Sequence, residues 1–153
     1  MKSKGFTLIE LLIVIVLISI FSGFILGVIN PSGLRAKTRD SQRVADLKKV
    51  QSALELYYAD NRKYPVGSNG VRISLALSSL VSGGYIPSLP TDPAPSASAG
   101  YCSGYRNYYY GSSGTSYALA AVMEVGSSAD ISSCPSWCGS TPALAYCVKS
   151  PNL

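Results

Sequence analysis

The segment from Phe6 to Ile29 constrains this chain most, because it holds 24 residues and Glu10 is its only charge. As a helix it would be about 36 Å long, at about 1.5 Å per residue, which is enough to cross a bilayer. It is longer than the apolar core of an ordinary signal peptide, about 7–15 residues, and no convincing small-x-small cleavage site follows it. We expect a helix that stays on the mature chain, and the simplest alternative is a plain signal anchor.

The charges around this segment give a conflicting orientation. Lys2 and Lys4 precede it, and Arg35, Lys37 and Arg39 follow it. Charge alone would place the C-terminal side in the cytoplasm. We expect that side to be extracytoplasmic, because the first two lysines lie on a very short tail and the cysteines indicate an oxidising compartment.

The cysteines all lie in the last third of the chain, at Cys102, Cys134, Cys138 and Cys147. An even number in a region rich in serine, tyrosine and glycine predicts disulfides. Four cysteines allow three pairings, and the sequence does not choose among them. Zinc is the alternative, but Cys102 and Cys147 form no matching close pair and the chain has no histidine to replace them.

The motif KGFTLIE at residues 4–10 resembles the class III signal of type IV pilins and pseudopilins. In that family a short basic leader is removed before the apolar segment. The resemblance implies cleavage between Gly5 and Phe6, N-methylation of Phe6, and Glu10 as the fifth residue of the mature chain. The stretch RDSQRVADLKKVQSALELYYADNRKYP, residues 39–65, resembles the exposed half of the family's first helix.

These observations predict four parts of the chain. They are a leader at 1–5, a transmembrane and assembly helix at 6–30, an amphipathic stalk at 31–64 and a small globular head at 65–153.

Glu10 needs a cation, because an unpaired carboxylate in apolar surroundings costs several kcal/mol. Cleavage would create an amine at Phe6, mostly charged at neutral pH. Within one helix the two groups are i and i+4, which permits a self-pair. In a filament, Glu10 of one subunit would instead meet the Phe6 amine of its neighbour and select one axial register. The alternative is that Glu10 reaches the membrane interface.

The stalk begins with an expected kink or unwinding at residues 30–33, where Pro31 interrupts the pattern. After it, one apolar stripe recurs at helical spacing: Val44, Leu47, Val50, Leu54, Tyr57 and Tyr58. We place the i, i+3 pairs Asp40/Arg43 and Asp46/Lys49 on the solvated side. Lys48, Lys49 and Arg39 are expected to face neighbouring subunits. A nucleic-acid site on this helix is not favoured.

The residues of the head, together with the stalk helix, predict an α+β fold in which a long helix packs on a small antiparallel meander. Strands are expected at 105–110, 117–125 and 144–149, with a hairpin turn at 111–114. One short helix is expected near 74–82, inside a loop that ends in several prolines. Disulfides would hold the loop 126–142 against the sheet.

The motif PTDP at residues 90–93 resembles the start of a loop in major pseudopilins of type II secretion. The aromatic residue and glycine that usually follow are replaced by Ala94-Pro95-Ser96, so calcium binding through Asp92 is not expected. We predict no metal and no cofactor.

The sequence thus predicts a filament subunit and not an enzyme, because it has no histidine and no convincing catalytic constellation. The leading hypothesis is a type IV pilin for attachment, motility or DNA uptake. The first alternative is a pseudopilin of type II secretion, and the second is a monomeric membrane-anchored surface binding protein.

The resemblance further implies a prepilin peptidase and methylase, inner-membrane assembly machinery and a helical homo-oligomer as partners. The chain would span the membrane once, with its head on the extracytoplasmic side. It would then enter an extracellular pilus or a periplasmic pseudopilus.

Overall fold

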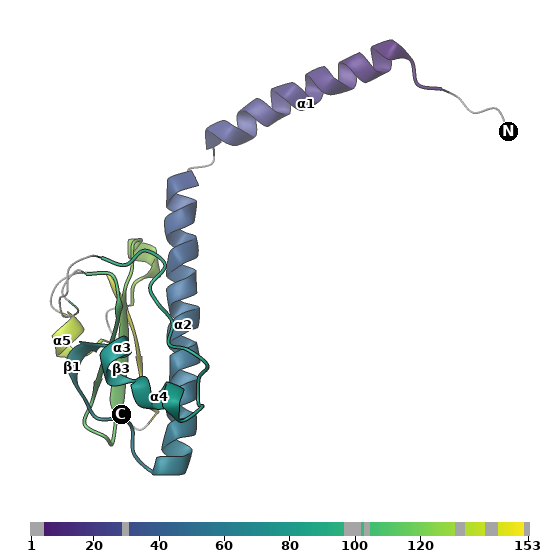
Figure 1. The fold of residues 1–153 in the computed structure, drawn as a ribbon. Coiled ribbons are helices and arrows are strands. Elements are labelled where there is room, and N and C mark those ends of the chain that lie inside the picture. Colours follow the sequence, from purple (N-terminus) through teal and green to yellow (C-terminus); the bar gives the residue numbers. More distant parts are fainter. Residues whose placement is uncertain are drawn as a thin grey trace. The chain divides into compact units, whose positions relative to one another are not determined.

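The computed structural model describes residues 5–28, 31–96, 102, 105–130, 134–139 and 144–151, and for residues 23–28 and Gly139 it describes the backbone alone. It forms two units, residues 1–34 and 35–153. Figure 1 shows a helix in the first unit, and a long helix beside a sheet in the second. Among the described residues, no helix combines the length and the hydropathy needed to cross a membrane.

The first helix, α1 (Leu8–Val28), begins directly after Thr7. The Thr7 hydroxyl accepts a hydrogen bond from the backbone N–H of Glu10 at 3.3 Å, which satisfies one of the free N–H groups at the helix start. Farther along, the hydroxyls of Ser19 and Ser22 donate to backbone carbonyls four residues earlier. These serines therefore introduce no unpaired polar group into an otherwise apolar segment.

The second helix, α2 (Pro31–Asn61), begins at a proline. Proline is favoured at the first helical position, since its φ is already helical and the N–H that it lacks would have no partner there. The predicted kink at residues 30–33 includes Asn30, which lies outside the described residues together with Ile29.

The α2 helix ends at Asn61, earlier than the predicted end at Tyr64-Pro65. Arg62 has a left-handed backbone, with φ of 56°, and its N–H donates to the carbonyl of Tyr58 at 2.8 Å. A residue in this conformation stops a helix because the chain turns away from the helical path. Arginine is uncommon at such a position, so the residue type did not predict that the helix ends here.

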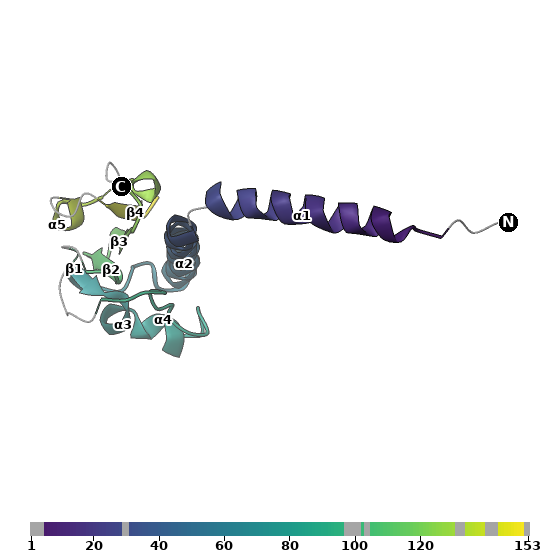
Figure 2. The same ribbon diagram turned by 90° about the horizontal axis from the view of Figure 1, so that it is seen from above.

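The predicted apolar stripe of α2 is confirmed. Leu47, Val50 and Leu54 are fully buried, while Val44, Tyr57 and Tyr58 pack against them at the edge of the core. These residues pack against one face of the sheet, and Figure 2 shows α2 along that face.

The sheet has four antiparallel strands in the order β1-β2-β3-β4, so the predicted α+β meander is confirmed with one more strand than expected. Its strands are β1 (Gly67–Arg72), β2 (Tyr108–Ser112), β3 (Tyr117–Val122) and β4 (Ala145–Lys149). The register runs Tyr110 opposite Leu119 and Ala120 opposite Cys147. Gly114, with φ of 97°, supplies the turn between β2 and β3.

Strand β1 is the correction to the predicted loop. Its sequence GSNGVR contains one β-branched residue and two glycines, so propensity argues against a strand. Pairing with the buried strand β2 overrides that preference. The register shifts between Gly67 and Val71, and Gly70 adopts φ of 76°, which accommodates the irregularity.

The predicted single helix at 74–82 is two short helices, α3 (Ile73–Ala76) and α4 (Ser78–Ser82). They meet at Leu77, which is fully buried and leaves helical geometry.

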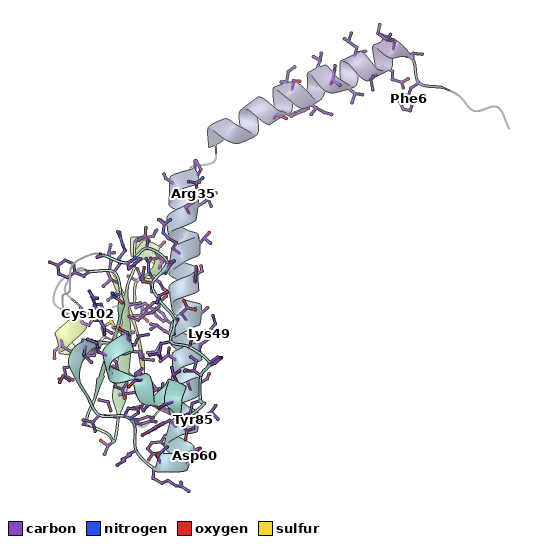
Figure 3. The ribbon with its side chains drawn as sticks, viewed as in Figure 1. Phe6, Arg35, Lys49, Asp60, Tyr85 and Cys102 are labelled. Atoms are coloured by element: carbon purple, nitrogen blue, oxygen red, sulfur yellow. A yellow bond between two sulfur atoms is a disulfide. The ribbon has the colours of Figure 1, made fainter. Side chains whose placement is uncertain are left out.

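The sheet separates two apolar clusters. On the α2 face lies the main core, which includes Tyr64, Tyr108, Tyr110 and Tyr117. On the opposite face lies a smaller cluster built from cysteines, Tyr109 and small side chains of β3 and β4. Figure 3 shows Cys102 on the side of the sheet away from α2.

Candidate functional site

The first candidate site is the predicted cleavage site between Gly5 and Phe6. Gly5 and Phe6 lie before α1 without helical structure, and Phe6 is 81% exposed. A Cβ atom added at Gly5 would meet no other atom within 4 Å. The fold of this chain therefore imposes no steric need for glycine at position 5.

Glu10 is exposed in the first turn of α1, and its backbone N–H rather than its carboxylate bonds Thr7. Within the described residues, the carboxylate has no ion-pair partner. The apolar side chains around it, from Phe6 to Phe21, are also exposed in this single chain. The helix thus presents one carboxylate on an uncovered apolar surface.

A second candidate site is a buried network of charges, which we call the ion cluster: Arg39, Asp40, Arg43, Asp92 and Glu124. Arg43 is at its centre and is fully buried. Its Nε and Nη2 donate to the two carboxylate oxygens of Asp92 at 2.7 Å each. Its Nη1 donates to Asp40 at 2.7 Å and to Glu124 at 2.8 Å.

Burial would by itself lower the pKa of Arg43, but the hydrogen bonds to Asp92, Glu124 and Asp40 raise it above its ordinary value. The guanidinium is therefore always charged. Removing one partner of such a group is costly, because the remaining charge stays buried and unpaired.

Arg39 holds the outer edge of the ion cluster. Its Nε donates to Glu124 Oε1 at 2.8 Å and its Nη2 bonds the other oxygen. This bond, together with that from Arg43, lowers the pKa of Glu124 to about 2. The expectation that Arg39 faces away from the head is therefore wrong, because its side chain bonds Glu124. A contact of Arg39 with neighbouring subunits stays a prediction.

Asp40 completes the ion cluster by accepting hydrogen bonds from the backbone N–H groups of Glu124 and Val125, both at 2.9 Å. The predicted pairs Asp40/Arg43 and Asp46/Lys49 do form, but Asp40, Arg43 and Asp46 are buried. Their placement on the solvated side was wrong. An i, i+3 charge pair looks the same in sequence whether solvent or a folded-back loop covers it.

Asp92 lies 4% exposed in the proline-rich loop, with both oxygens bonded to Arg43. Its Oδ1 also accepts from the backbone N–H of Ala94 at 2.8 Å. These bonds give the carboxylate a structural role in anchoring the loop to α2. Among the described residues, no group of three or more potential metal ligands gathers.

Two further carboxylates of α2 are bound by tyrosines of the sheet side. Asp46 accepts from Tyr108 at 2.9 Å and from the exposed Lys49 at 2.9 Å. Glu55 accepts from Tyr64 at 3.0 Å and from Tyr117 at 2.7 Å. The sequence offered no signal for these contacts, since the partners are 9 to 62 residues apart.

The cysteines form two disulfides, Cys102–Cys138 and Cys134–Cys147, with Cα–Cα distances of 5.0 and 5.1 Å. The second links the loop after β3 to β4. This pairing is one of the three that the sequence left open. Through it, the loop that carries α5 (Ser136–Gly139) is held on the face of the sheet away from α2.

Comparisons with known proteins match two separate regions of the chain. Residues 1–26 match a model of the prokaryotic N-terminal methylation motif. Residues 32–127 match the model "Type II secretion system (T2SS), protein G", which covers more than half of the chain. The chain belongs to the type II secretion system protein G family.

Curated relatives agree with the protein G family. The type II secretion system core protein G of Klebsiella pneumoniae is 32% identical over 99 residues, which is 60% of this chain and 69% of the relative. That of Escherichia coli is also 32% identical, over 60% of this chain and 67% of the relative. That of Vibrio cholerae is 33% identical, over 60% of this chain and 66% of the relative. No solved structure matches the chain.

The protein G match includes α2 and the strands β1 to β3, together with Asp92 and Glu124 of the ion cluster. Strand β4, helix α5 and three of the four cysteines lie after it. The α+β fold is pilin-like, and the family makes the chain a structural protein and not an enzyme.

Proposed function

We propose that this chain is a pseudopilin, a subunit of the filament of a type II secretion system. The observation that carries the proposal is the protein G match over residues 32–127. The pseudopilin was the first alternative from the sequence, and the comparisons favour it over the leading hypothesis of a type IV pilin. The chain would join other copies in a helical filament built by inner-membrane machinery.

Maturation would begin with cleavage between Gly5 and Phe6 by a prepilin peptidase, followed by N-methylation of Phe6. The methylation-motif match over residues 1–26 supports this step. Gly5 and Phe6 lie outside the helix and exposed, so a peptidase reaches the bond without unfolding α1. Because the chain itself tolerates a side chain at Gly5, the need for glycine would belong to the peptidase pocket.

Assembly would pair the Glu10 carboxylate with the Phe6 amine of a neighbouring subunit. At about 4 Å and an effective dielectric near 20, this attraction is on the order of 4 kcal/mol before desolvation. Packing of apolar helices alone tolerates many axial positions. The ion pair would select the one in which both charges are paired.

Before assembly, the apolar segment from Phe6 to Ile29 would anchor the chain in the inner membrane once. The head would lie on the extracytoplasmic side, where an oxidising compartment permits its two disulfides. After assembly the subunit would belong to a periplasmic pseudopilus. Two features of the chain, its disulfides and its eleven tyrosines, remain arguments for the alternative of a surface pilus.

The deciding experiment deletes the gene in its native host and measures secretion of type II cargo and surface fibres. If the chain is a pseudopilin, cargo should stay in the periplasm of the deletion strain, and complementation should restore its export. Surface fibres that disappear while secretion stays normal would contradict the proposal and support a pilin.

A further inference from the structure

A hollow on the face of the sheet away from α2 lies outside the elements used for assembly. It encloses about 200 Å³. Its walls come from Asn69 of β1, the β2–β3 hairpin, and the loop residues Pro135 and Trp137. Figure 1 shows α5, which contains Trp137, beside β1. We call it the hairpin hollow.

Gly111 lets the walls of the hairpin hollow come together. A Cβ at this position would lie 2.8 Å from Asn69 Oδ1 and 3.1 Å from Trp137 Cζ2. Any side chain there would push the amide and the indole apart. The glycine in β2 therefore matters for convergence of these two groups and not for a left-handed backbone.

The disulfides restrain the backbone that carries the indole. Trp137 stands between Cys134, which is bonded to Cys147 of β4, and Cys138, which is bonded to Cys102. The loop thus has two covalent attachments within five residues. A loop held in this way loses little backbone freedom when a ligand binds, which favours affinity.

The chemistry of the walls selects the ligand. None of the nine lining residues is charged. The wall combines an aromatic ring and a proline with the amide of Asn69 and the hydroxyl of Ser116. Among the described residues, neither of these two polar groups has a hydrogen-bond partner. A site of this kind fits an uncharged molecule with one apolar face and a hydrogen-bonding rim.

We propose that the hairpin hollow binds a neutral hexopyranose unit of a glycan. A pyranose ring has C–H groups on one face, which pack on an aromatic ring, and hydroxyls at its rim. Trp137 would supply the aromatic surface, and Asn69 and Ser116 would bond the hydroxyls. The proposal does not depend on whether the filament is a pseudopilus or a pilus, since the hollow lies within the head.

The test uses the fluorescence of Trp137, the single tryptophan of the chain. The full-length protein is purified in a detergent without a sugar headgroup, such as lauryldimethylamine oxide. It is then titrated with methyl β-glucopyranoside, cellotriose and triacetylchitotriose. We expect a saturable spectral change with at least one of them, and none with mannitol, which has hydroxyls but no ring.

Variants separate binding from a general solvent effect. Asn69→Ala and Ser116→Ala should each raise the sugar concentration at half-saturation about three- to tenfold, because each variant loses one hydrogen bond. The matched control Ser88→Ala, at an exposed serine of another hollow, should leave it unchanged.

The proposal would be overturned if none of the three sugars gave a saturable change. It would also be overturned if the Asn69→Ala and Ser116→Ala variants bound the sugar as tightly as the unmodified protein. The uncharged, capped peptide N-acetyl-Ser-Gly-Ser-amide is titrated as the competing class of ligand. A response to this peptide without a response to the sugars would make the hollow a peptide site and the proposal wrong.

Discussion

Glu124 shows how the fold changes the chemistry of one side chain. It follows β3 and lies partly buried against Arg39 and Arg43 of α2, more than 80 residues earlier in the chain. The hydrogen bond from Arg39 is the main cause of its lowered pKa, and that from Arg43 adds to it. The carboxylate therefore stays charged in the folded head at any pH above about 2.

This lowered pKa predicts an acid-sensitive head. A carboxylate with a folded pKa below its unfolded value stabilises the protein above the unfolded pKa, and the contribution is lost as pH falls through the folded one. Stability should thus decline between pH 4.5 and about 2. Urea unfolding of the head across this range measures it.

The matched variant for this prediction is Glu124→Gln, which keeps the shape but cannot titrate. It should be less stable near neutral pH and should show a shallower decline in acid. An unchanged slope in this variant would show that other carboxylates cause the decline.

At the scale of elements, α2 holds the head together through two kinds of contact. Its apolar stripe packs on the sheet, and the ion cluster ties it to the proline-rich loop and to the turn after β3. Near its C-terminal end, Tyr85 donates to Asp60 at 3.0 Å, and Figure 3 labels both residues beside the end of α2.

A pair of leucines tests the stripe of α2. Leu54 is fully buried, while Leu56 is 57% exposed. Leu54→Ala should lower the free energy of unfolding by about 2–5 kcal/mol, because it leaves a cavity. Leu56→Ala should change it by less than about 0.5 kcal/mol. Equal effects in urea unfolding would contradict the burial that the structure assigns to these residues.

The two disulfides should differ in their contribution to stability. They close loops with sequence separations of 36 and 13 residues, Cys102–Cys138 and Cys134–Cys147. Loop-closure entropy predicts about 4 kcal/mol for the longer loop and about 3 kcal/mol for the shorter one. Double serine variants compared by thermal unfolding measure the order. The reverse order would show that interactions within the folded loop outweigh chain entropy.

At the scale of the whole molecule, α1 exposes both its apolar side chains and the carboxylate of Glu10. The exposed apolar side chains need a covering, which a membrane or neighbouring helices would supply. The carboxylate needs a cation, and processing at Phe6 would create one.

Glu10→Ala should therefore abolish filament assembly and leave the fold of the head intact, because the residue belongs to the unit of residues 1–34 and not to that of the head. Sheared filaments and circular dichroism of the purified subunit measure the two effects. The control Glu10→Asp keeps the charge on a shorter side chain and should assemble in part. Normal filaments from the alanine variant would refute the role of the pair.

The mature N-terminus gives a second prediction at this scale. Mass spectrometry of native protein should find N-methylated Phe6 as the first residue. Gly5→Ala should retain the leader, although the fold of the chain has room for the methyl group. An intact Met1 in native material would contradict both processing and the ion pair that depends on it.

The sequence by itself determined the features that depend on local pattern. The leader motif, the long apolar run and the helical stripe of α2 lie in contiguous residues, and each predicts its element without knowledge of the rest of the chain. The α+β class and three of the strands followed for the same reason. Strand β1 did not, because its residues do not favour a strand and only pairing with β2 makes it one.

The tertiary structure alone decided which charges are buried and which cysteines pair. Arg43 and Asp92 are 49 residues apart, and no local pattern distinguishes a buried i, i+3 pair from a solvated one. The three cysteine pairings are equivalent until the sheet brings Cys147 beside the loop that contains Cys134. Contacts between distant segments depend on the path of the whole backbone, which is why these features appear only in the folded chain.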